Sequence, residues 1–392
     1  MKKFASLISI AVSLFIVSSS FSAETSYKSR KEVKNIILMV PDGMGLADVT
    51  AARITRNGID GVPLYFETLK RIGYQRTYSE DNTITDSAAA ASAWSCGEKF
   101  ANGEICYHSD GRMYNPTVLE LAKAEGKATG LVATSTITHA TPAAFGSHVK
   151  SRSCEQEIAR QYVEITKPDV MLGGGISKFR SATPDRCGTA GDYITLAMIN
   201  GYQVVYTKSD VEAAASSGAM KLLGLFNNSG MTPEYLRTPG ITEPRLPEMT
   251  KTALAILERD RDGFFLLVEG SQIDWGNHAN DLPYKLGETL AFDEAVKVVL
   301  DWINENPERK QHSLLIVVAD HETGGFSING NENGGILGEF VPGWTSAGHT
   351  GVDTLIWSQG PGSAELGRAI DNTDIYWIME KGLKDNSDRH EK

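Results

Sequence analysis

The stretch Asn35–Gly43, NIILMVPDG, decides the architecture of this chain. Five consecutive apolar side chains follow Asn35, a pattern typical of a strand that is buried on both faces of a sheet. The carboxylate of Asp42 comes directly after this run and Pro41. In an α/β protein that position lies at the carboxyl edge of the sheet, where ligands bind. The stretch therefore predicts an α/β fold with a polar site at one sheet edge.

Six further apolar runs, and the helical patterns between them, extend this prediction along the chain. The runs predict strands at Gly130–Thr134, Asp169–Leu172, Tyr202–Tyr206, Phe264–Val268, Ser313–Ala319 and Thr354–Ser358. Helices are expected at Asn115–Glu125, with proline in its first turn, and at Phe292–Ile303, where apolar residues repeat with helical spacing. This alternation predicts a three-layer sandwich, a mainly parallel sheet flanked by helices. Stretches rich in Gly, Asn and Pro, Ser181–Asp192 and Asn329–Thr345, predict surface loops.

Residues 1–22 have the pattern of a secretory signal peptide, in which Lys2 and Lys3 precede an apolar stretch and then small residues. Its removal takes the formal net charge from −11 to −13, because it holds two lysines and no acidic residue. A net charge this negative argues against nucleic acids and anionic membranes as partners. No later segment is apolar enough to span a membrane. We expect an exported protein without a membrane anchor, periplasmic in a Gram-negative cell and extracellular otherwise.

The four cysteines all follow this segment, in the part of the chain expected to meet an oxidising compartment. Of the three possible pairings we predict the one between sequence neighbours, Cys96–Cys106 and Cys154–Cys187. A zinc–thiolate site is the alternative, but no Cys-x-x-Cys spacing favours it.

Carboxylates and imidazoles gather in four segments, Val40–Gly43, Glu269–His278, Ala319–His321 and Gly348–His349. Asp274 and His278 are four residues apart, so on a helical turn they share one face and can chelate one ion. Asp320 and His321 follow an apolar run, where a sharp turn can aim both side chains inward. His349, before a glycine-containing turn, can approach an ion closely.

The types of these side chains indicate which ions they suit. Mixed nitrogen and oxygen ligands suit zinc, whereas oxygen ligands such as Asp42, Glu269 and Thr141 suit magnesium. A single histidine is more often a packed or surface residue than a ligand. Three histidines that each lie beside a carboxylate or at a turn together predict a metal site.

Ser87 begins a predicted helix in Thr85–Trp94, TDSAAAASAW, because the alanines after it are strong helix formers. A serine at that place ordinarily caps the helix with its own hydroxyl. The alternative is a nucleophile: the free amides and the dipole of the helix start hold an anion while a metal ion deprotonates the hydroxyl.

Further along the chain, Arg152 follows the motif His139–Phe145, HATPAAF. The planar guanidinium of Arg152 matches two oxygens of a phosphate. An arginine judged on its own is more often part of a surface ion pair.

These motifs in this order resemble the alkaline phosphatase family. The resemblance covers about Asn35–Ser363 and rests on the Asp-Gly after the first strand, TDSAAAASAW, HATPAAF with His148 and Ser151-Arg152, EGSQID with His278, ADHETGG and GHTG. It implies the alkaline-phosphatase-like sandwich, with residues 23–392 as a single catalytic domain that carries surface-loop insertions. It also implies a homodimer.

The resemblance assigns an expected role to each matching residue. Ser87 is similar to the nucleophile that takes the phosphoryl group from a phosphate monoester, and Arg152 to the residue that binds the phosphate oxygens. Two zinc ions and one magnesium ion per chain are implied. Their expected ligands are Asp274, His278 and His349 for the first zinc, Asp42, Asp320 and His321 for the second, and Asp42, Glu269 and Thr141 for magnesium.

Two positions depart from some branches of the family. His139 stands where certain members carry aspartate, and it either ligates the third metal or orders its waters. Trp275 stands where those members carry lysine. The loss of a cation beside the bound phosphate predicts weaker phosphate binding, with a packing role as the alternative for Trp275.

Two other kinds of function compete with this one. Phosphodiesterases, phosphomutases and sulfatases share the superfamily, but TDSAAAA lacks the proline and arginine of a sulfatase nucleophile, and Glu269, Thr141 and Arg152 together favour a monoesterase. A secreted zinc- or phosphate-binding protein without turnover needs no serine at a helix start among metal ligands.

Overall fold

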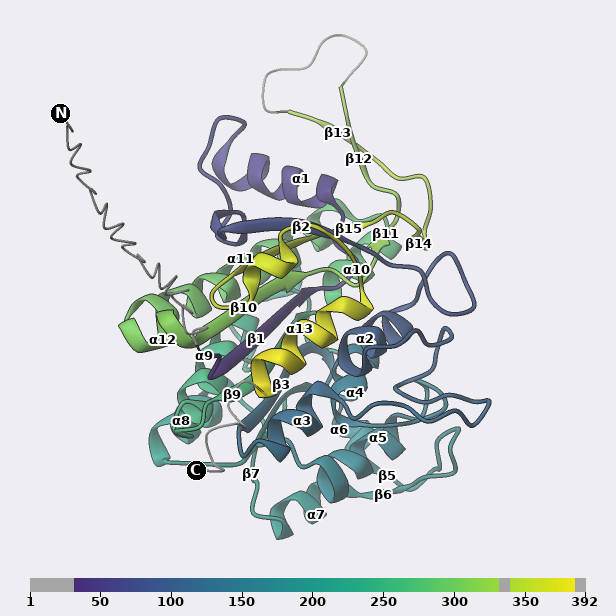
Figure 1. Ribbon diagram of the computed structural model, residues 1–392, viewed down its shortest axis with the longest axis vertical. Coiled ribbons are helices and arrows are strands. Elements are labelled where there is room, and N and C mark those ends of the chain that lie inside the picture. The colour runs from purple at the N-terminus through teal and green to yellow at the C-terminus, as the bar shows by residue number, and fades with distance from the viewer. Residues whose placement is uncertain (1–31, 331–338, 385–392) are drawn as a thin grey trace, which may run out of the picture. The chain divides into compact units, whose positions relative to one another are not determined.

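The computed structural model describes residues 32–330 and 339–384. The predicted signal peptide and the middle of the loop Asn329–Thr345 lie outside the described residues. From residue 32 on, the described chain belongs to one compact unit built around a ten-stranded sheet (Figure 1). Helices cover both faces of this sheet, which confirms the predicted α/β sandwich.

The strand order is β16-β2-β15-β10-β1-β9-β3-β4-β8-β7. These strands are β1 (Asn35–Pro41), β2 (Arg71–Arg76), β3 (Ala128–Thr136), β4 (Val170–Gly174), β7 (Gln203–Val205), β8 (Leu222–Leu225), β9 (Phe264–Gly270), β10 (Ser313–Val318), β15 (Thr354–Gln359) and β16 (Ala369–Asp371). β1 lies near the middle and pairs in parallel with both β9 and β10. All seven strands predicted from the sequence are present.

One strand runs against the others and changes how the site forms. β15 is antiparallel to both β10 and β2, so it starts at the edge where the parallel strands end. His349 precedes β15 and reaches that edge for this reason. Asp42 and Asp320 follow their strands, whereas His349 reaches the same edge ahead of its strand.

The two faces of the sheet follow from side-chain alternation along β1. Ile36, Leu38 and Val40 face one helical layer, formed by α2 (Ser87–Cys96), α3 (Val118–Ala124), α4 (Ala140–Gly146), α5 (Glu155–Gln161), α7 (Tyr193–Ile199) and α13 (Thr373–Lys384). Ile37 and Met39 face the other, formed by α1 (Leu46–Asn57), α8 (Lys208–Ser217), α9 (Leu246–Leu257) and α11 (Leu282–Asn304). Because both faces are buried, the central strands have no polar alternation.

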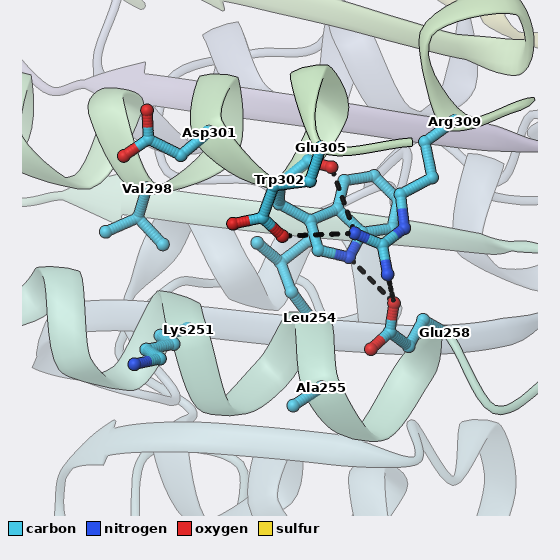
Figure 2. Close-up of a pocket in the computed structure, with 9 residues that line it drawn as sticks. All are labelled: Lys251, Leu254, Ala255, Glu258, Val298, Asp301, Trp302, Glu305 and Arg309. Carbon is cyan, nitrogen blue, oxygen red and sulfur yellow. Dashed lines mark hydrogen bonds and ion pairs between the residues drawn. The ribbon is translucent and has the colours of Figure 1, made fainter. Parts of the chain in front are cut away.

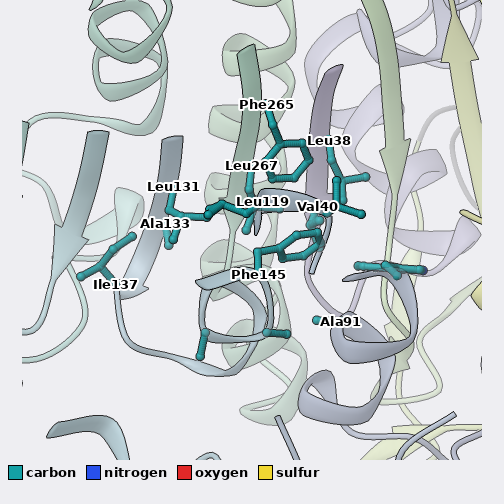
Figure 3. Packing of buried hydrophobic residues seen from close by; sticks show 14 of the residues in the cluster. Leu38, Val40, Ala91, Leu119, Leu131, Ala133, Ile137, Phe145, Phe265 and Leu267 are labelled. Atoms are coloured by element: carbon teal, nitrogen blue, oxygen red, sulfur yellow. The ribbon is translucent and has the colours of Figure 1, made fainter. Parts of the chain in front are cut away.

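The first of these layers fixes the helix that carries the predicted nucleophile. Figure 3 shows Phe145 of α4 against Phe265 and Leu267 of β9, with Ala91 of α2 beside Val40. The rings of Phe145 and Phe265 stack with their centroids 5.4 Å apart. α2 packs mainly against α4 and α13, and this packing holds its N-terminus at the carboxyl edge of the sheet.

The structure corrects two details of the predicted elements. The helix expected at Asn115–Glu125 begins only at Val118, because Thr117 caps it. The Thr117 hydroxyl accepts from the backbone N–H of Glu120, and the Glu120 carboxylate accepts from the backbone N–H of Thr117. The strands β2, β8 and β16 were not predicted. β2 is exposed at several positions and has no apolar run, β8 is a four-residue run interrupted by Gly224, and β16 has only three residues.

Both predicted disulfides are confirmed. Cys96 pairs with Cys106, and Cys154 pairs with Cys187. The first closes the loop that follows α2. The second ties the start of α5 to the loop Ser181–Asp192, whose ends pair as the short strands β5 (Arg180–Ser181) and β6 (Gly191–Asp192).

Candidate active site

Three carboxylates end three neighbouring strands. Asp42 follows β1, Glu269 lies at the end of β9, and Asp320 follows β10, and all three are fully buried. Gly43 makes this convergence possible, because it has a φ of +73° and a Cβ there would lie 2.8 Å from the backbone of Asp274. The sheet register, more than any local sequence, brings these acids together.

A short helix and a strand pair add the remaining predicted ligands. α10 (Gln272–His278) places Asp274 and His278 on one face, with Nε2 of His278 3.3 Å from Oδ1 of Asp274. The short strands β11 (Glu322–Thr323) and β14 (His349–Thr350) pair across the site, so Nε2 of His349 lies 3.6 Å from the same carboxylate oxygen. His321 stacks on His349, with ring centroids 3.6 Å apart.

Outer partners fix which nitrogen of each imidazole faces the site. The Nδ1 atom of His278 donates to the carbonyl of Ala347 at 2.6 Å, and that of His349 to the carbonyl of Thr85 at 2.9 Å. Nδ1 of His321 lies 3.2 Å from the Thr323 hydroxyl. Each Nε2 is thereby turned toward the carboxylates, as in metal sites where second partners set the ligand tautomer.

The hydroxyl of Ser87 is free of the capping role that the sequence left open. Asp86 caps α2 instead, accepting from the backbone N–H of Ala89 at 3.0 Å. Oγ of Ser87 lies 3.2 Å from Nε2 of His321, and the side chain is buried. A serine in the first turn, beside an imidazole and unused by the helix, is placed for nucleophilic attack.

Arg152 reaches the site from the turn before α5. Its Nη1 donates to Oδ2 of Asp86 at 2.9 Å, and its Nη2 lies 3.1 Å from Nε2 of His139. Burial disfavours the charge, but Asp86 outweighs it and raises the pKa of Arg152, so the guanidinium stays protonated. Burial and the adjacent guanidinium lower the pKa of His139 to about 4, so this imidazole is neutral.

The lack of hydrogen-bond partners on its buried oxygen atoms suits this site to metal ions. Within the described residues, buried oxygens without a hydrogen-bond partner concentrate here: both of Asp42, Oδ2 of Asp320, Oε1 of Glu269 and Oγ1 of Thr141. Such atoms are costly unless an ion satisfies them. Burial and the neighbouring acids raise the pKa of Asp42 well above its usual range, and burial raises that of Glu269 to about 7. The acids repel one another until a cation is present.

The ligand atoms form three groups at this edge, each within 4.8 Å. The groups are Asp274 with His321 and His349, Asp42 with Asp320 and His321, and Asp42 with His139 and Glu269. The second is the set expected for one zinc. The first differs from expectation, because His321 lies between the two zinc sets, whereas His278 stands further out with 37% of its side chain exposed. The third brings His139 beside Asp42 and Glu269, two of the residues expected to hold magnesium.

Sequence reasoning missed two residues that organise the site. Asp86 both caps α2 and holds Arg152, and the preference of aspartate for helix starts could have revealed the cap. Thr323 donates to Oδ1 of Asp274 at 2.5 Å and contacts His321. No sequence signal marks Thr323, because its role depends on the pairing of β11 with β14.

His278 gives the site a predicted pH dependence. Asp274 raises the pKa of His278 to about 9, so its ion pair stabilises the metal-free protein fully below about pH 6.5 and is lost as the pH rises through 9. A metal ion needs the neutral ring and competes with this proton. We expect zinc to raise the unfolding temperature more at pH 9 than at pH 6.5, measured on chelated and zinc-loaded protein. The difference should shrink in His278→Gln, and an equal zinc effect at both pH values contradicts the prediction.

A hollow elsewhere on the surface is not part of this site. It measures about 340 Å³ and lies between α9 and α11 (Figure 2). Trp302 and Arg309 both contact Oε2 of Glu258, and Arg309 lies 4.7 Å from the Trp302 ring centroid. The polar groups best placed to bind a ligand there thus satisfy one another.

In the described part of the chain no helix is long and apolar enough to cross a membrane.

Comparison with known proteins identifies the class to which this fold and site belong. A model of the family described as alkaline phosphatase matches residues 33–338. Alkaline phosphatase 3 of Bacillus subtilis is 34% identical, over 98% of this chain and 99% of its own. The solved alkaline phosphatase of the Antarctic bacterium TAB5 has a TM-score of 0.80 at 32% identity, covering 91% of this chain and 99% of its own. A variant of that enzyme with one histidine changed to aspartate, with magnesium bound in its M3 site, has a TM-score of 0.79, 32% identity and the same coverage.

The fold and its metal-ligating edge therefore define a metal-binding hydrolase of phosphate esters. The chain belongs to the alkaline phosphatase family, whose members are phosphomonoester hydrolases.

Proposed function

We propose that this chain hydrolyses phosphate monoesters to an alcohol and inorganic phosphate through a phosphorylated Ser87, with two zinc ions and one magnesium ion. The observation that carries the proposal is the uncommitted hydroxyl of Ser87. Asp86 takes over the helix cap, and Oγ of Ser87 faces Nε2 of His321 at 3.2 Å, among buried acids that need cations.

The reaction follows from what the side chains can do. In the first step the Ser87 oxygen bonds to phosphorus while the bond to the alcohol oxygen breaks, and in the second a water oxygen displaces Ser87 and frees phosphate. Arg152, oriented by Asp86, donates to phosphate oxygens, and the start of α2 offers backbone N–H groups. The ions, when bound, supply Lewis acidity toward the serine oxygen and the leaving alkoxide.

We assign the ions to the residues expected from the sequence. Asp274, His278 and His349 would hold one zinc, Asp42, Asp320 and His321 the other, and Asp42, Glu269 and Thr141 magnesium. Three divalent ions bring six positive charges against four carboxylates. The resulting local excess attracts a phosphate dianion in spite of the acidic chain.

Removing the metals tests this proposal most directly. Chelation should abolish hydrolysis of p-nitrophenyl phosphate, and zinc followed by magnesium should restore it, with three ions per chain by elemental analysis. The bis-ester should be a much poorer substrate, because Arg152 and the ions match the free oxygens of a monoester. Failure of both metals to restore activity in folded protein contradicts the three-metal assignment.

The corner around His139 supports a modified magnesium site. The ring of Trp275 meets that of His139 edge-on, with centroids 6.0 Å apart, and lies against Gly230, where a Cβ would come within 2.6 Å of it. Trp275 thus packs beside the group that contacts Arg152 and brings no charge. The TAB5 variant has magnesium with aspartate in place of a histidine. We infer that His139 weakens magnesium binding in this corner relative to a carboxylate.

Replacing Trp275 with lysine should strengthen inhibition by phosphate. An ammonium near Arg152 adds a cation beside the bound oxyanion, and we expect an inhibition constant lower by a factor of about 5, the equivalent of about 1 kcal/mol for one partly exposed charge. Trp275→Phe, which keeps a ring against Gly230, is the control and should change it little. Equal phosphate inhibition in the lysine variant and the wild type speaks against a charge effect at this position.

The remaining expectations about the whole protein are proposals as well. We propose that residues 1–22 direct export and that residues 23–392 form a single catalytic domain. The two disulfides support an oxidising compartment, periplasmic or extracellular. A homodimer stays a prediction.

A further inference from the structure

A second cluster of ligand-type side chains lies outside the active site, around the loop that follows α2. Glu80 precedes the helix, and Glu98, Glu104 and His108 follow it, flanking the Cys96–Cys106 disulfide. Ligand atoms of Glu80, Glu104 and His108 lie within 4.8 Å of one another. None of these residues takes part in the proposed hydrolysis.

His108 is the member that needs explaining. Only 2% of it is exposed, and among residues 32–330 and 339–384 neither ring nitrogen has a hydrogen-bond partner. The ring is held in place by Phe100, on which it stacks with centroids 4.4 Å apart. A buried imidazole with two unsatisfied nitrogens is costly, so its orientation toward the carboxylates requires a compensating interaction.

The distances around His108 resemble those of a metal site more than those of hydrogen bonds. Nδ1 lies 3.7 Å from Oε2 of Glu80, and Nε2 lies 3.5 Å from Oε2 of Glu98. The first is too long for a hydrogen bond, but it approaches the roughly 3.3 Å between two ligands that each bind one zinc ion at about 2.0 Å. Glu98, itself held by the backbone N–H of Asn115 at 2.9 Å, then orients the ring from behind.

The carboxylates have free capacity for an ion and a route for it. Arg112 contacts Oε1 of Glu80 and leaves Oε2 toward His108. Glu104 accepts one backbone N–H on each oxygen, from Ser109 at 3.0 Å and Ala101 at 3.3 Å, so each keeps a lone pair. Glu80 is partly exposed, so the cluster opens to solvent on its side.

We propose that Glu80, Glu104 and His108 bind a divalent cation, with zinc preferred for this mixed nitrogen and oxygen set, and that Glu98 positions His108. Two carboxylates and a neutral imidazole balance the charge of one ion, and water completes the coordination.

A cation there braces the loop that holds Arg152. Asn102 accepts from the backbone N–H of Asp86 at 2.9 Å, and the N–H of Gly103 donates to Oδ1 of Asp86 at 3.1 Å. The carbonyl of Gly103 accepts from the backbone N–H of Arg152 at 2.8 Å. Glu104 is the next residue, so a cation on it fixes the segment that sets both Asp86 and Arg152.

Zinc counting on the intact protein tests the proposal without reference to hydrolysis. Wild type, Glu80→Gln and His108→Gln are dialysed against buffered free zinc over a range of concentrations, and bound zinc is measured by elemental analysis. We expect each variant to hold one zinc ion fewer per chain than the wild type, and the difference curves of the two variants to coincide. Glu98→Gln should weaken the same site by a factor of about 10–100, as expected for a partner behind a ligand.

Asp110→Asn is the matched control. Asp110 is exposed and binds the same Arg112, with Nε 2.6 Å from its Oδ2, but it is not in the ligand set. This variant should bind as much zinc as the wild type. Equal zinc in wild type and Glu80→Gln overturns the proposal, and so does an equal loss of zinc in Asp110→Asn. Glu80 is partly exposed, so its variant should fold normally.

Discussion

Replacing Ser87 with alanine is expected to remove phosphomonoester hydrolysis, lowering kcat by on the order of 10³-fold or more. In the proposed reaction this side chain supplies the oxygen that bonds to phosphorus. It supplies no cap, since Asp86 does, so the fold should be retained. Turnover of p-nitrophenyl phosphate, zinc content and thermal unfolding measure the three consequences separately.

Ser95→Ala is the control on the same helix. Ser95 is buried in α2, and within the described chain its hydroxyl has no hydrogen-bond partner, so this change removes no known contact. Activity should stay near that of the wild type. If Ser87→Ala keeps hydrolysing at a wild-type rate, the serine is no nucleophile; if it loses activity only together with its zinc, the result shows a metal-site defect instead.

Asp42→Asn should have two effects of opposite sign. Activity should fall by several orders of magnitude, because Asp42 belongs to two of the ligand groups. The metal-free protein should become more stable, because its buried carboxylate is disfavoured by burial and by Asp320 and Asp274. That raised pKa means that ionisation costs stability as the pH rises, so the gain over metal-free wild type should grow toward pH 9. Thermal unfolding of chelated protein at pH 5 and pH 9 measures it.

A second buried aspartate makes the comparison sharp. Asp48 is fully buried and contacts Nζ of Lys285, which is also fully buried. Asp48→Asn leaves that ammonium without its counter-charge and should cost about 3–5 kcal/mol. The same substitution at two buried carboxylates thus has opposite expected outcomes. Destabilisation of the metal-free protein by Asp42→Asn at pH 9 contradicts the idea that cations are needed to offset this cluster.

The sequence predicts most strands and most of the site residues because local patterns mark both. Apolar runs mark strands that are buried on both faces, and a carboxylate directly after such a run, as at Asp42, marks the functional edge. The spacing of Asp274 and His278 is likewise a property of one helical turn. These features do not depend on which strands are neighbours.

What the sequence could not supply depends on pairing between distant segments. The antiparallel direction of β15 brings His349 to the site, and the pairing of β11 with β14 gives Thr323 its contacts. The central position of His321 between two ligand groups is a matter of ring placement at ångström scale. The strand β2 could not be predicted, because its side chains are largely exposed and no continuous apolar run marks it.

The central position of β1 also sets when the enzyme can first act. β1 is the first strand of the described chain, yet its partners β9 and β10 come more than 220 residues later, with Asn35 opposite Ser313. Contacts between residues so far apart in the sequence form late in folding, because a long loop must close first. Asp42 therefore meets Glu269 and Asp320 only when nearly the whole chain is available. An extended polypeptide of full length has every one of these residues but no assembled site, so catalysis begins only with the finished fold.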